Sequence, residues 1–283
     1  YFISIWRYIS RNKGFTVINV LGLAIGMTAC MLITQYVMHE FSYDDFHEKK
    51  ARIFRMQQDR YDNGVLSTRW AAGCAGIGPD MKANFPEVEA YVRLTRTNPT
   101  LASGDVFFKE DNVFYASEEF FRIFSIKLIA GVDSSVLRDP FKIAISQSLA
   151  RKYFGDVNPI GKILKNNGKE EYEVTGVFED LPVNTHMQIN ALMSFVSLTK
   201  LWNDPVLSWS WDGFLTYVLL DEHANPESVL AKIPALAEKQ AGEEMKRFNA
   251  AITFQMQPIT DIHLDSNFMM EFKPNGNRQS AYF

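Results

Sequence analysis

Cysteine is nearly absent from this chain, whose 283 residues include Cys30 and Cys74 and no other cysteine. Cys30 lies inside a long apolar run and Cys74 lies well outside it, so the two are not placed to form a disulfide. Without a disulfide framework, the chain must hold its fold together by packing.

Basic residues are also in short supply. Removing Arg7, Arg11 and Lys13, which precede the apolar run, leaves 26 of the 29 Lys and Arg residues against 33 Asp and Glu residues, a balance of −7 for the rest of the chain. Nucleic-acid binding needs a basic stripe or patch. The charge balance therefore predicts that nucleic acid is not a partner.

Catalytic motifs are missing as well. The segment NPIGKIL, from Asn158 to Leu164, lacks the first glycine of a phosphate-binding GxxxxGK loop. The sequence contains no nucleophile elbow and no zinc-binding helix motif. We therefore predict no catalytic residue and no cofactor site in this chain.

Several polar residues after the apolar run have side chains that can bind metal: His39, Glu40, Asp44, Asp45, His47 and Glu48. Their spacing matches no known metal motif, and acidic residues are expected just after a membrane span, so we predict no metal site. The other histidines, His186, His223 and His263, are far apart in the sequence. We expect structural or solvent-facing roles for them.

The sequence does contain one long hydrophobic run, because Phe15 to Met38 includes no charged side chain. Its 24 residues would form a helix of about 36 Å, enough to cross a hydrocarbon core about 30 Å thick. The run continues into His39 and Glu40 without a signal-peptide cleavage site. We predict a transmembrane helix over residues 14–38. Basic residues precede it and acidic residues follow it, which predicts a cytoplasmic N-terminal side and an exported body.

Residues 1–13 show helical spacing of apolar side chains between basic ones. The residues that define this pattern are Phe2, Ile5, Trp6, Arg7, Ile9 and Arg11. Such a segment is typical of an amphipathic helix lying flat at the inner membrane surface, in contact with lipid. The spacing leaves open whether the segment also contacts a cytoplasmic partner.

Within the apolar run, small and polar residues recur on one helical stripe: Asn19, Gly22, Gly26 and Cys30. Small residues allow close approach of another helix, and Asn19 favours a hydrogen-bonding neighbour over lipid. We predict that this stripe packs against another transmembrane helix. The alternative is that these glycines have no partner, since glycine is common in membrane helices.

The sequence of the exported body predicts an α+β fold. Strands are predicted over 53–61 and 88–97 around a helix-like segment at 70–84, and over 214–220 and 252–259 around a helix that begins at Asn225 and kinks at Pro234. These make two β-α-β units. The middle of the chain predicts a hairpin of 106–108 with 113–115, and a helix capped by Ser117. It also predicts a helix over 147–154 capped by Ser146 and ended by Gly155.

Four stretches carry a resemblance to a known family. They are NKGFTVINVLGLAIGM (12–27), HEFSYDDFHEKKARIFR (39–55), FYASEEFFRIFSIKLIAG (114–131) and the long stretch from AISQSLARKYF to NALMSF (144–195). Together they resemble the MacB-like, FtsX-like permeases of ABC transporters, in the form found in Bacteroidota. The resemblance covers nearly the whole chain.

This resemblance implies a periplasmic core domain over 39–277, with a porter-like part at 45–98 plus 210–265 and an inserted, smaller α+β subdomain at 99–209. Residues 278–283 would approach a second transmembrane helix. The implied location is the inner membrane. The implied partners are an ABC ATPase subunit that binds ATP and Mg²⁺, and a second permease subunit in a homodimer or heterodimer. The resemblance leaves open whether a periplasmic adaptor and an outer-membrane channel also take part.

The function implied is a permease subunit whose periplasmic domain transmits ATP-driven conformational change to export or extract a substrate. An alternative is the extracytoplasmic sensor domain of a membrane signalling protein, which would also combine one span with a mixed domain. A third possibility, an anchored periplasmic hydrolase, lacks a catalytic motif. The transported substrate does not follow from the fold.

Overall fold

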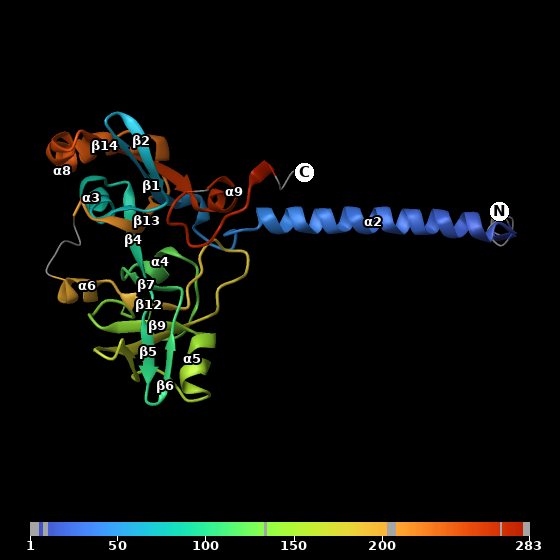
Figure 1. Cartoon of the computed structure of the whole chain (residues 1–283), viewed down its shortest axis with the longest axis horizontal. Coiled ribbons are helices and arrows are strands. Elements are labelled where there is room, and N and C mark those ends of the chain that lie inside the picture. The colour runs from blue at the N-terminus through green and yellow to red at the C-terminus, as the bar shows by residue number, and fades with distance from the viewer. Residues whose placement is uncertain (1–5, 8–10, 133–134, 203–207, 267, 280–283) are drawn as a thin grey trace.

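The computed structural model describes residues 6–7, 11–132, 135–202, 208–266 and 268–279. Its longest element is helix α2 (Lys13–Phe41), whose 29 residues have a mean hydropathy of 2.1 in their most apolar window and are nowhere buried. The helix projects from the body as an isolated rod (Figure 1). At about 1.5 Å per residue it is about 44 Å long, which exceeds the thickness of a hydrocarbon core. α2 is therefore long and apolar enough to cross a membrane.

Four strands form the part of the body built from both ends of the chain. They are β1 (Ile53–Asp62), β4 (Val88–Thr97), β13 (Asp212–Leu220) and β14 (Ala250–Pro258), in the spatial order β14-β1-β13-β4 with antiparallel neighbours. Helix α3 (Ile77–Asn84) links β1 to β4, and helices α7 (Pro226–Leu230) and α8 (Ile233–Arg247) link β13 to β14. This is the split β-α-β arrangement of ferredoxin-like folds. It confirms the α+β fold and both predicted β-α-β units.

The helices of this part bury their apolar sides on the sheet. Ile77 and Met81 of α3 and Leu236 of α8 join Met56 and Val218 of the strands in one core cluster. The Asn225 side chain accepts hydrogen bonds from the backbone N–H groups of the first turn of α7, which explains why that helix begins at Pro226. The expected kink at Pro234 is a break, because α7 ends and α8 begins with the proline in its first turn.

Residues between β4 and β13 extend the same sheet. Their strands are β5 (Thr100–Ser103), β6 (Val106–Lys109), β7 (Val113–Ala116), β8 (Leu128–Ala130), β9 (Lys142–Ser146), β10 (Ile163–Asn166), β11 (Glu170–Phe178) and β12 (Ala191–Ser194). The order continues β4-β7-β12-β9-β11-β10-β5-β6, and β8 pairs with β11. The helices here are α4 (Phe120–Ile123), α5 (Gln147–Phe154) and α6 (Val196–Leu201).

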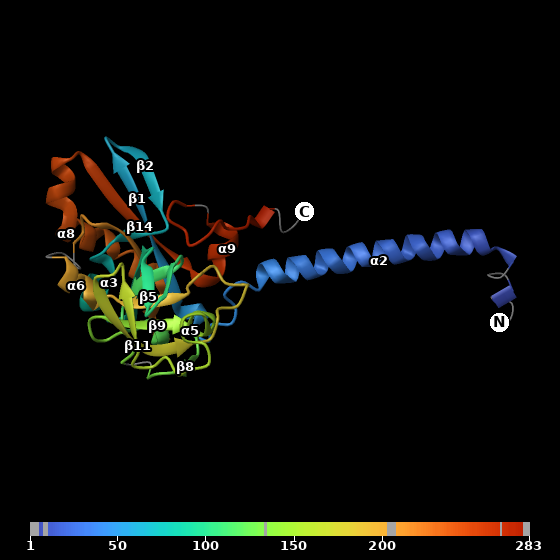
Figure 2. The same cartoon turned by 60° about the horizontal axis from the view of Figure 1, so that its bottom comes forward.

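The remaining elements are short. Strand β2 (Val65–Trp70) pairs with β1, and β3 (Gly73–Cys74) pairs with β13. The 3₁₀ helix η1 (Lys50–Arg52) precedes β1, while η2 (Ile259–Asp261) and α9 (Ile262–Asp265) follow β14. Figures 1 and 2 both show α9 and the C-terminal segment beside the body end of α2.

The two parts of the body share a strand and a core. β4 pairs with β13 from Val88 to Leu94 and with β7 from Leu94 to Thr97. One apolar cluster also includes residues of both parts, such as Val92 and Leu219 from the first and Phe120 and Leu192 from the second. The sheet and this core make the body continuous, and the exact domain boundaries stay a prediction.

Two local predictions are wrong and one is confirmed. β6 forms its hairpin with β5 across Gly104, whose φ of +57° suits a tight turn, while β7 pairs with β4 and β12 in the interior of the sheet. The Ser117 hydroxyl accepts from the backbone N–H of Arg93, so it does not cap α4. By contrast, Ser146 caps α5 through the N–H of Leu149, and Gly155 ends it with φ +61°.

The segment at 70–84 is helical only in its second half. Trp70 ends β2, and β3 occupies Gly73 and Cys74 before α3 begins at Ile77. Gly78 explains the close packing of α3, because a Cβ there would lie 2.8 Å from the Tyr91 ring. The small residues of this segment thus allow α3 to pack closely on the sheet, and they also form the turn that precedes α3.

Candidate functional site

The most distinctive polar structure lies where α2 meets the body. We call residues Ser42 to Arg52 the junction loop. It begins as α2 ends, and Asp44 then takes a left-handed backbone conformation with φ +58°. Its N–H donates to the Asn184 carbonyl over 2.9 Å. A left-handed aspartate is uncommon and requires stabilisation by its surroundings.

The Asp44 carboxylate supplies that stabilisation. It is completely buried and accepts hydrogen bonds from the Thr185 hydroxyl over 2.5 Å, from the His186 backbone N–H over 3.1 Å, and from Nδ1 of His186 over 2.8 Å. Buried charge is costly unless it is paired and fully hydrogen-bonded. Asp44 meets that condition, and so fixes the junction loop to the segment that precedes β12.

His186 passes this contact on to the centre of the sheet. Its Nε2 lies 2.7 Å from the hydroxyl of Tyr217 on β13. With Nδ1 donating to Asp44, a neutral imidazole accepts from Tyr217 at Nε2. An Asp–His–hydroxyl series also occurs in hydrolases, but Tyr217 is entirely buried here. A hydroxyl that no substrate can reach serves structure, so this series is a structural tie.

Electrostatics support a charged Asp44. Burial alone would raise the pKa of the Asp44 carboxyl, but the neighbouring His186 and the hydrogen bonds of Thr185 and His186 outweigh burial and hold that pKa below its ordinary value. Burial raises the pKa of Tyr217 far above its usual range, so the phenol stays protonated. At neutral pH the two ends of the series are therefore a carboxylate at Asp44 and a protonated phenol at Tyr217.

A second buried histidine, His47 of the junction loop, is neutral. Burial lowers its pKa to about 4, although the nearby Asp44 acts in the opposite direction. Nδ1 of His47 accepts the backbone N–H of Ser125 over 3.2 Å, just after α4. The imidazole therefore ties the loop to the middle part of the chain.

Further contacts fasten the junction loop to both parts of the body. The Glu48 N–H donates to the Ser125 hydroxyl over 2.8 Å, and the Lys49 ammonium donates to the Arg122 carbonyl over 2.7 Å. Arg52 binds Glu89 of β4 and the carbonyl that ends β13, each over 3.0 Å. The junction loop is therefore bonded to both parts of the body.

The last turn of α2 contacts the segment that follows β14. The Glu40 carboxylate lies 3.0 Å from Nε2 of His263 on α9, and the Tyr43 ring stacks on that imidazole with centroids 3.3 Å apart. Gly276 completes the contact, because a Cβ there would lie 3.0 Å from both Glu40 and His263. The C-terminal segment thus returns to the base of α2.

A buried ion pair anchors this returning segment. Arg55 of β1 is fully buried, and its guanidinium donates to both carboxylate oxygens of Glu271, over 2.5 and 2.9 Å. The same group donates to Gln257 over 2.7 Å and to Ser266 over 2.8 Å. A fork-like guanidinium suits such two-pronged contact.

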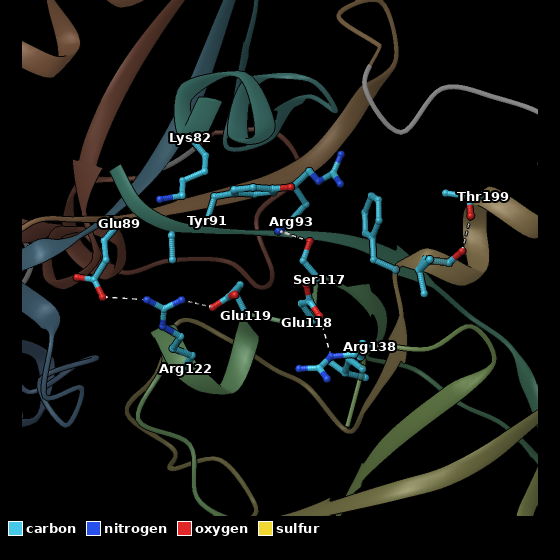
Figure 3. Close-up of a pocket in the computed structure, with 14 residues that line it drawn as sticks. Lys82, Glu89, Tyr91, Arg93, Ser117, Glu118, Glu119, Arg122, Arg138 and Thr199 are labelled. Carbon is cyan, nitrogen blue, oxygen red and sulfur yellow. Dashed lines mark hydrogen bonds and ion pairs between the residues drawn. The ribbon is translucent and has the colours of Figure 1, made fainter. Parts of the chain in front are cut away.

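A cavity of about 830 Å³ lies on the body between α3, β4, α4 and α6 (Figure 3). Arg122 reaches Glu89 over 3.1 Å and Glu119 over 2.9 Å, and Arg138 lies 3.6 Å from Glu118. The Arg93 guanidinium lies 4.1 Å from the centre of the Phe195 ring and donates to the Ala75 carbonyl. The lining residues that the structure describes include no His, Cys or Asp. The cavity therefore offers ion pairs and an aromatic wall, and its carboxylates Glu89, Glu118 and Glu119 are each engaged by an arginine.

The predicted packing stripe lies wholly on α2. Its members are exposed along the helix: Asn19, Gly22, Gly26 and Cys30. A Cβ at Gly22 or Gly26 would meet no atom of this chain within 4 Å. The stripe is open to another helix, and its packing stays a prediction.

The predicted interfacial helix is described in part. Trp6 and Arg7 are helical and exposed, Arg11 is exposed, and Asn12 separates this stretch from α2. Phe2, Ile5 and Ile9 lie outside the described residues. The position of this stretch at a membrane surface stays a prediction.

The possible metal ligands are dispersed. His39, Asp45 and Glu48 are exposed, whereas Glu40, Asp44 and His47 take part in the contacts above. Across the described ranges, no three His, Cys, Asp or Glu side chains are arranged to hold a metal. His186 and His263 have the structural roles expected of them, and His223 is exposed.

The residues that tie the junction were not identified as a group from the sequence. His186 is 142 residues from Asp44, and Glu271 is 216 residues from Arg55. No local spacing connects such partners. The available signal was weaker: polar residues cluster just after the span, which indicates a structured loop.

The fold and the apolar helix define a membrane-anchored protein with an extracytoplasmic α+β domain. A family profile described as the MacB-like periplasmic core domain matches residues 16–236. The chain belongs to this family, whose members are components of ABC transporter permeases that work with ATPase partners. Family membership thus favours a permease over a sensor.

Two solved structures, a permease domain and an extracellular transporter domain, share the fold. A domain assigned to a permease protein of Porphyromonas gingivalis is 24% identical with a TM-score of 0.66, covering 81% of this chain and 95% of that one. The extracellular domain of the noncanonic ABC-type transporter YknZ from Gram-positive bacteria is 14% identical with a TM-score of 0.51, covering 72% and 99%. The periplasmic region of MacB from Actinobacillus actinomycetemcomitans is 14% identical with a TM-score of 0.49, covering 70% and 87%. No curated protein matches the chain.

Proposed function

We propose that this chain is the mechanical, non-catalytic part of an ABC permease, and that its junction loop transmits movement of α2 to the exported body. A partner ATPase subunit binds ATP and Mg²⁺ on the cytoplasmic side of the inner membrane. The interfacial segment and α2 carry the resulting movement outward. The body, moving as one piece, exports or extracts a substrate in the periplasm.

One observation carries this proposal. The junction loop is tied by buried contacts to both parts of the body, through Asp44 and His186 to Tyr217 and through His47 to Ser125. A flexible linker would absorb movement of the span, whereas a buried and hydrogen-bonded connection passes it on. Nucleotide shifts the conformational equilibrium only if the two states differ in affinity for it. We therefore expect two packings of the permease dimer that nucleotide distinguishes.

The test compares Asp44→Asn with Asp45→Asn in the full permease, reconstituted with its ATPase. Asp45 is the exposed neighbour of Asp44, and among the contacts described its carboxylate accepts only from the Lys50 ammonium. Distances between spin labels on the two exported bodies are measured without nucleotide and in an ATP-trapped state. We expect Asp44→Asn to keep ATP hydrolysis and to lose most of the distance change, and Asp45→Asn to change neither.

A full distance change in folded Asp44→Asn and Tyr217→Phe variants would contradict the proposal. Tyr217→Phe is the second variant because it removes one hydroxyl and keeps the ring in the core. It covers the case in which Asp44→Asn fails to fold. Circular dichroism of each purified variant verifies that the comparison is made on folded protein.

A further inference from the structure

Strand β4 has an open edge inside the cavity of Figure 3. One side of β4 pairs with β13 from Val88 to Leu94, whereas the other side pairs with β7 only from Leu94 to Thr97. β7 ends at Ala116, and within the described part of the chain no strand takes its place beside Val88 to Val92. An open strand edge presents backbone N–H and C=O groups to any strand that is added to it.

The outward backbone groups of this edge can be assigned. The Ser117 N–H donates to the Arg93 carbonyl over 3.1 Å, and the Arg93 N–H donates to the Ser117 hydroxyl over 3.2 Å. Both backbone groups of Arg93 therefore point to the side of β4 that faces β7. Directions alternate along a strand, and the pairing with β13 is regular over this stretch. Tyr91 thus directs its N–H and its carbonyl to the open side, where neither has a hydrogen-bond partner among the described residues.

The cavity lies where the sheet changes its partners. Its walls include Ser117, which follows β7, and Phe195, which follows β12. β7 and β12 are parallel, and after each of them the chain leaves the sheet for a helix, α4 or α6. The crevice beyond the carboxyl ends of parallel strands is a common ligand position in open sheets. The cavity volume of about 830 Å³ is also within the range of ligand pockets.

We propose that this edge binds an extended segment of another polypeptide as an added strand, antiparallel to β4 and in line with β7. The segment residue opposite Tyr91 accepts the Tyr91 N–H at its carbonyl and donates its own N–H to the Tyr91 carbonyl. A polypeptide backbone repeats this pair of groups at strand spacing, so it is the ligand that the edge fits. The stretch from Val88 to Val92 is about 17 Å long at about 3.4 Å per residue, enough for a segment of about five residues.

Charge favours an acidic segment. The side chain of the residue opposite Tyr91 lies on the same face of the sheet as Tyr91 itself. Helix α3 packs on that face and places the exposed Lys82 there, and Figure 3 shows Lys82 and Arg122 on opposite sides of β4. The Arg93 guanidinium is on the same face as Lys82, 5.5 Å from the centre of the Tyr91 ring. The carboxylate of Glu89 is already paired with Arg122. A carboxylate opposite Tyr91 therefore approaches two cations.

Peptide binding tests the inference on the full chain in detergent micelles, without nucleotide. The probe is the acetylated peptide amide Thr-Val-Glu-Val-Thr with a fluorophore, and fluorescence anisotropy measures its binding. Its matched control carries a methyl group on the backbone nitrogen of the central residue, which keeps every side chain and the charge but removes the N–H that would donate to Tyr91. We expect the methylated peptide to bind about tenfold more weakly, or weaker still.

A charge reversal tests the place of binding. Lys82→Glu changes the cavity, and Lys239→Glu, at an exposed lysine of α8, is its matched control. Both side chains are exposed, so folding should tolerate either change. We expect Lys82→Glu to weaken binding of the acidic peptide about fivefold and Lys239→Glu to leave it unchanged. A peptide with lysine at its centre should bind more tightly to Lys82→Glu than to the wild-type chain.

Equal binding of the methylated and unmethylated peptides would overturn the inference, because recognition would then not use the peptide backbone. Absence of binding to the wild-type chain would overturn it too. Equally tight binding of acetylglutamate amide would show that the occupant is a small anion, and an equal loss in Lys82→Glu and Lys239→Glu would place the peptide outside the cavity. The proposed function concerns the junction loop and ATP-driven movement. Peptide binding uses neither, so the two stand or fail separately.

Discussion

Two polar networks of this protein differ in their access to water. At the junction, Asp44, His186, Arg55 and Glu271 are buried or nearly so, and each has several partners. In the cavity, Arg122 and Arg138 also make ion pairs, but the side chains of these two arginines are 48% and 59% exposed. Exposed ion pairs contribute little to stability because water screens them, whereas breaking a buried pair leaves an uncompensated charge. The polar contacts at the junction are therefore expected to persist, whereas the ion pairs in the cavity can break and re-form.

The largest effect is expected at the buried ion pair. Glu271→Gln removes the charge that neutralises Arg55, and leaving a buried guanidinium unpaired costs about 3–5 kcal/mol of unfolding free energy. Denaturant unfolding of the purified chain measures this loss. Glu243→Gln is the matched control, since that carboxylate on α8 is exposed, and should change stability by less than about 0.5 kcal/mol. A similar, small loss in both variants would remove the distinction between the two networks.

The junction should also make stability fall in mild acid. Unfolded His47 binds a proton below its ordinary pKa of 6.5, whereas folded His47 stays neutral down to about 4. The unfolded state then binds more protons, so stability falls between pH 6.5 and pH 4, by about 3 kcal/mol over that window. Below it, protonation of Asp44, whose folded pKa is lowered, adds a further loss.

His47→Asn isolates this contribution, because its amide oxygen can accept the Ser125 N–H without titrating near neutral pH. Unfolding free energy measured from pH 7 to pH 4 should decline less steeply in the variant than in the wild-type chain, by about 1.4 kcal/mol per pH unit at most. Parallel profiles would show that His47 is not buried as a neutral group.

A smaller loss is expected at the end of the histidine series. Tyr217→Phe keeps the ring in the core and leaves Nε2 of His186 without its hydroxyl partner. An unsatisfied buried acceptor costs about 1–3 kcal/mol. Denaturant unfolding checks this value, and an unchanged midpoint would mean that water replaces the hydroxyl.

The smallest effect belongs to the cavity. Arg122→Gln removes two ion pairs on exposed side chains, and we expect a loss of at most about 1 kcal/mol. The loss should shrink further in high salt, which screens exposed charges. A salt-independent loss as large as that of Glu271→Gln would place this network with the junction.

The sequence predicted those features that depend on neighbouring residues. The apolar run, the Ser146 cap and the strand over 88–97 are local patterns, and the structure has them at or within a few residues of the expected positions. The prediction of a hairpin at 106–115 was wrong because strand pairing depends on strands that are distant in the sequence. β7 pairs with β4 and β12, and β6 pairs with β5. For the same reason the sequence did not predict the contacts at the junction, because the partners come from segments that are far apart in the chain.

The account depends most on α2 and the body moving as one unit. Spin labels at Met38 on α2 and at Lys239 on α8, both exposed, report the distance between the span and the body in the full permease with its ATPase. We expect one narrow distance distribution that is the same without nucleotide and in the ATP-trapped state, and that broadens in Asp44→Asn. A wild-type distance that shifts when ATP is trapped would show that the junction bends, and would contradict the account.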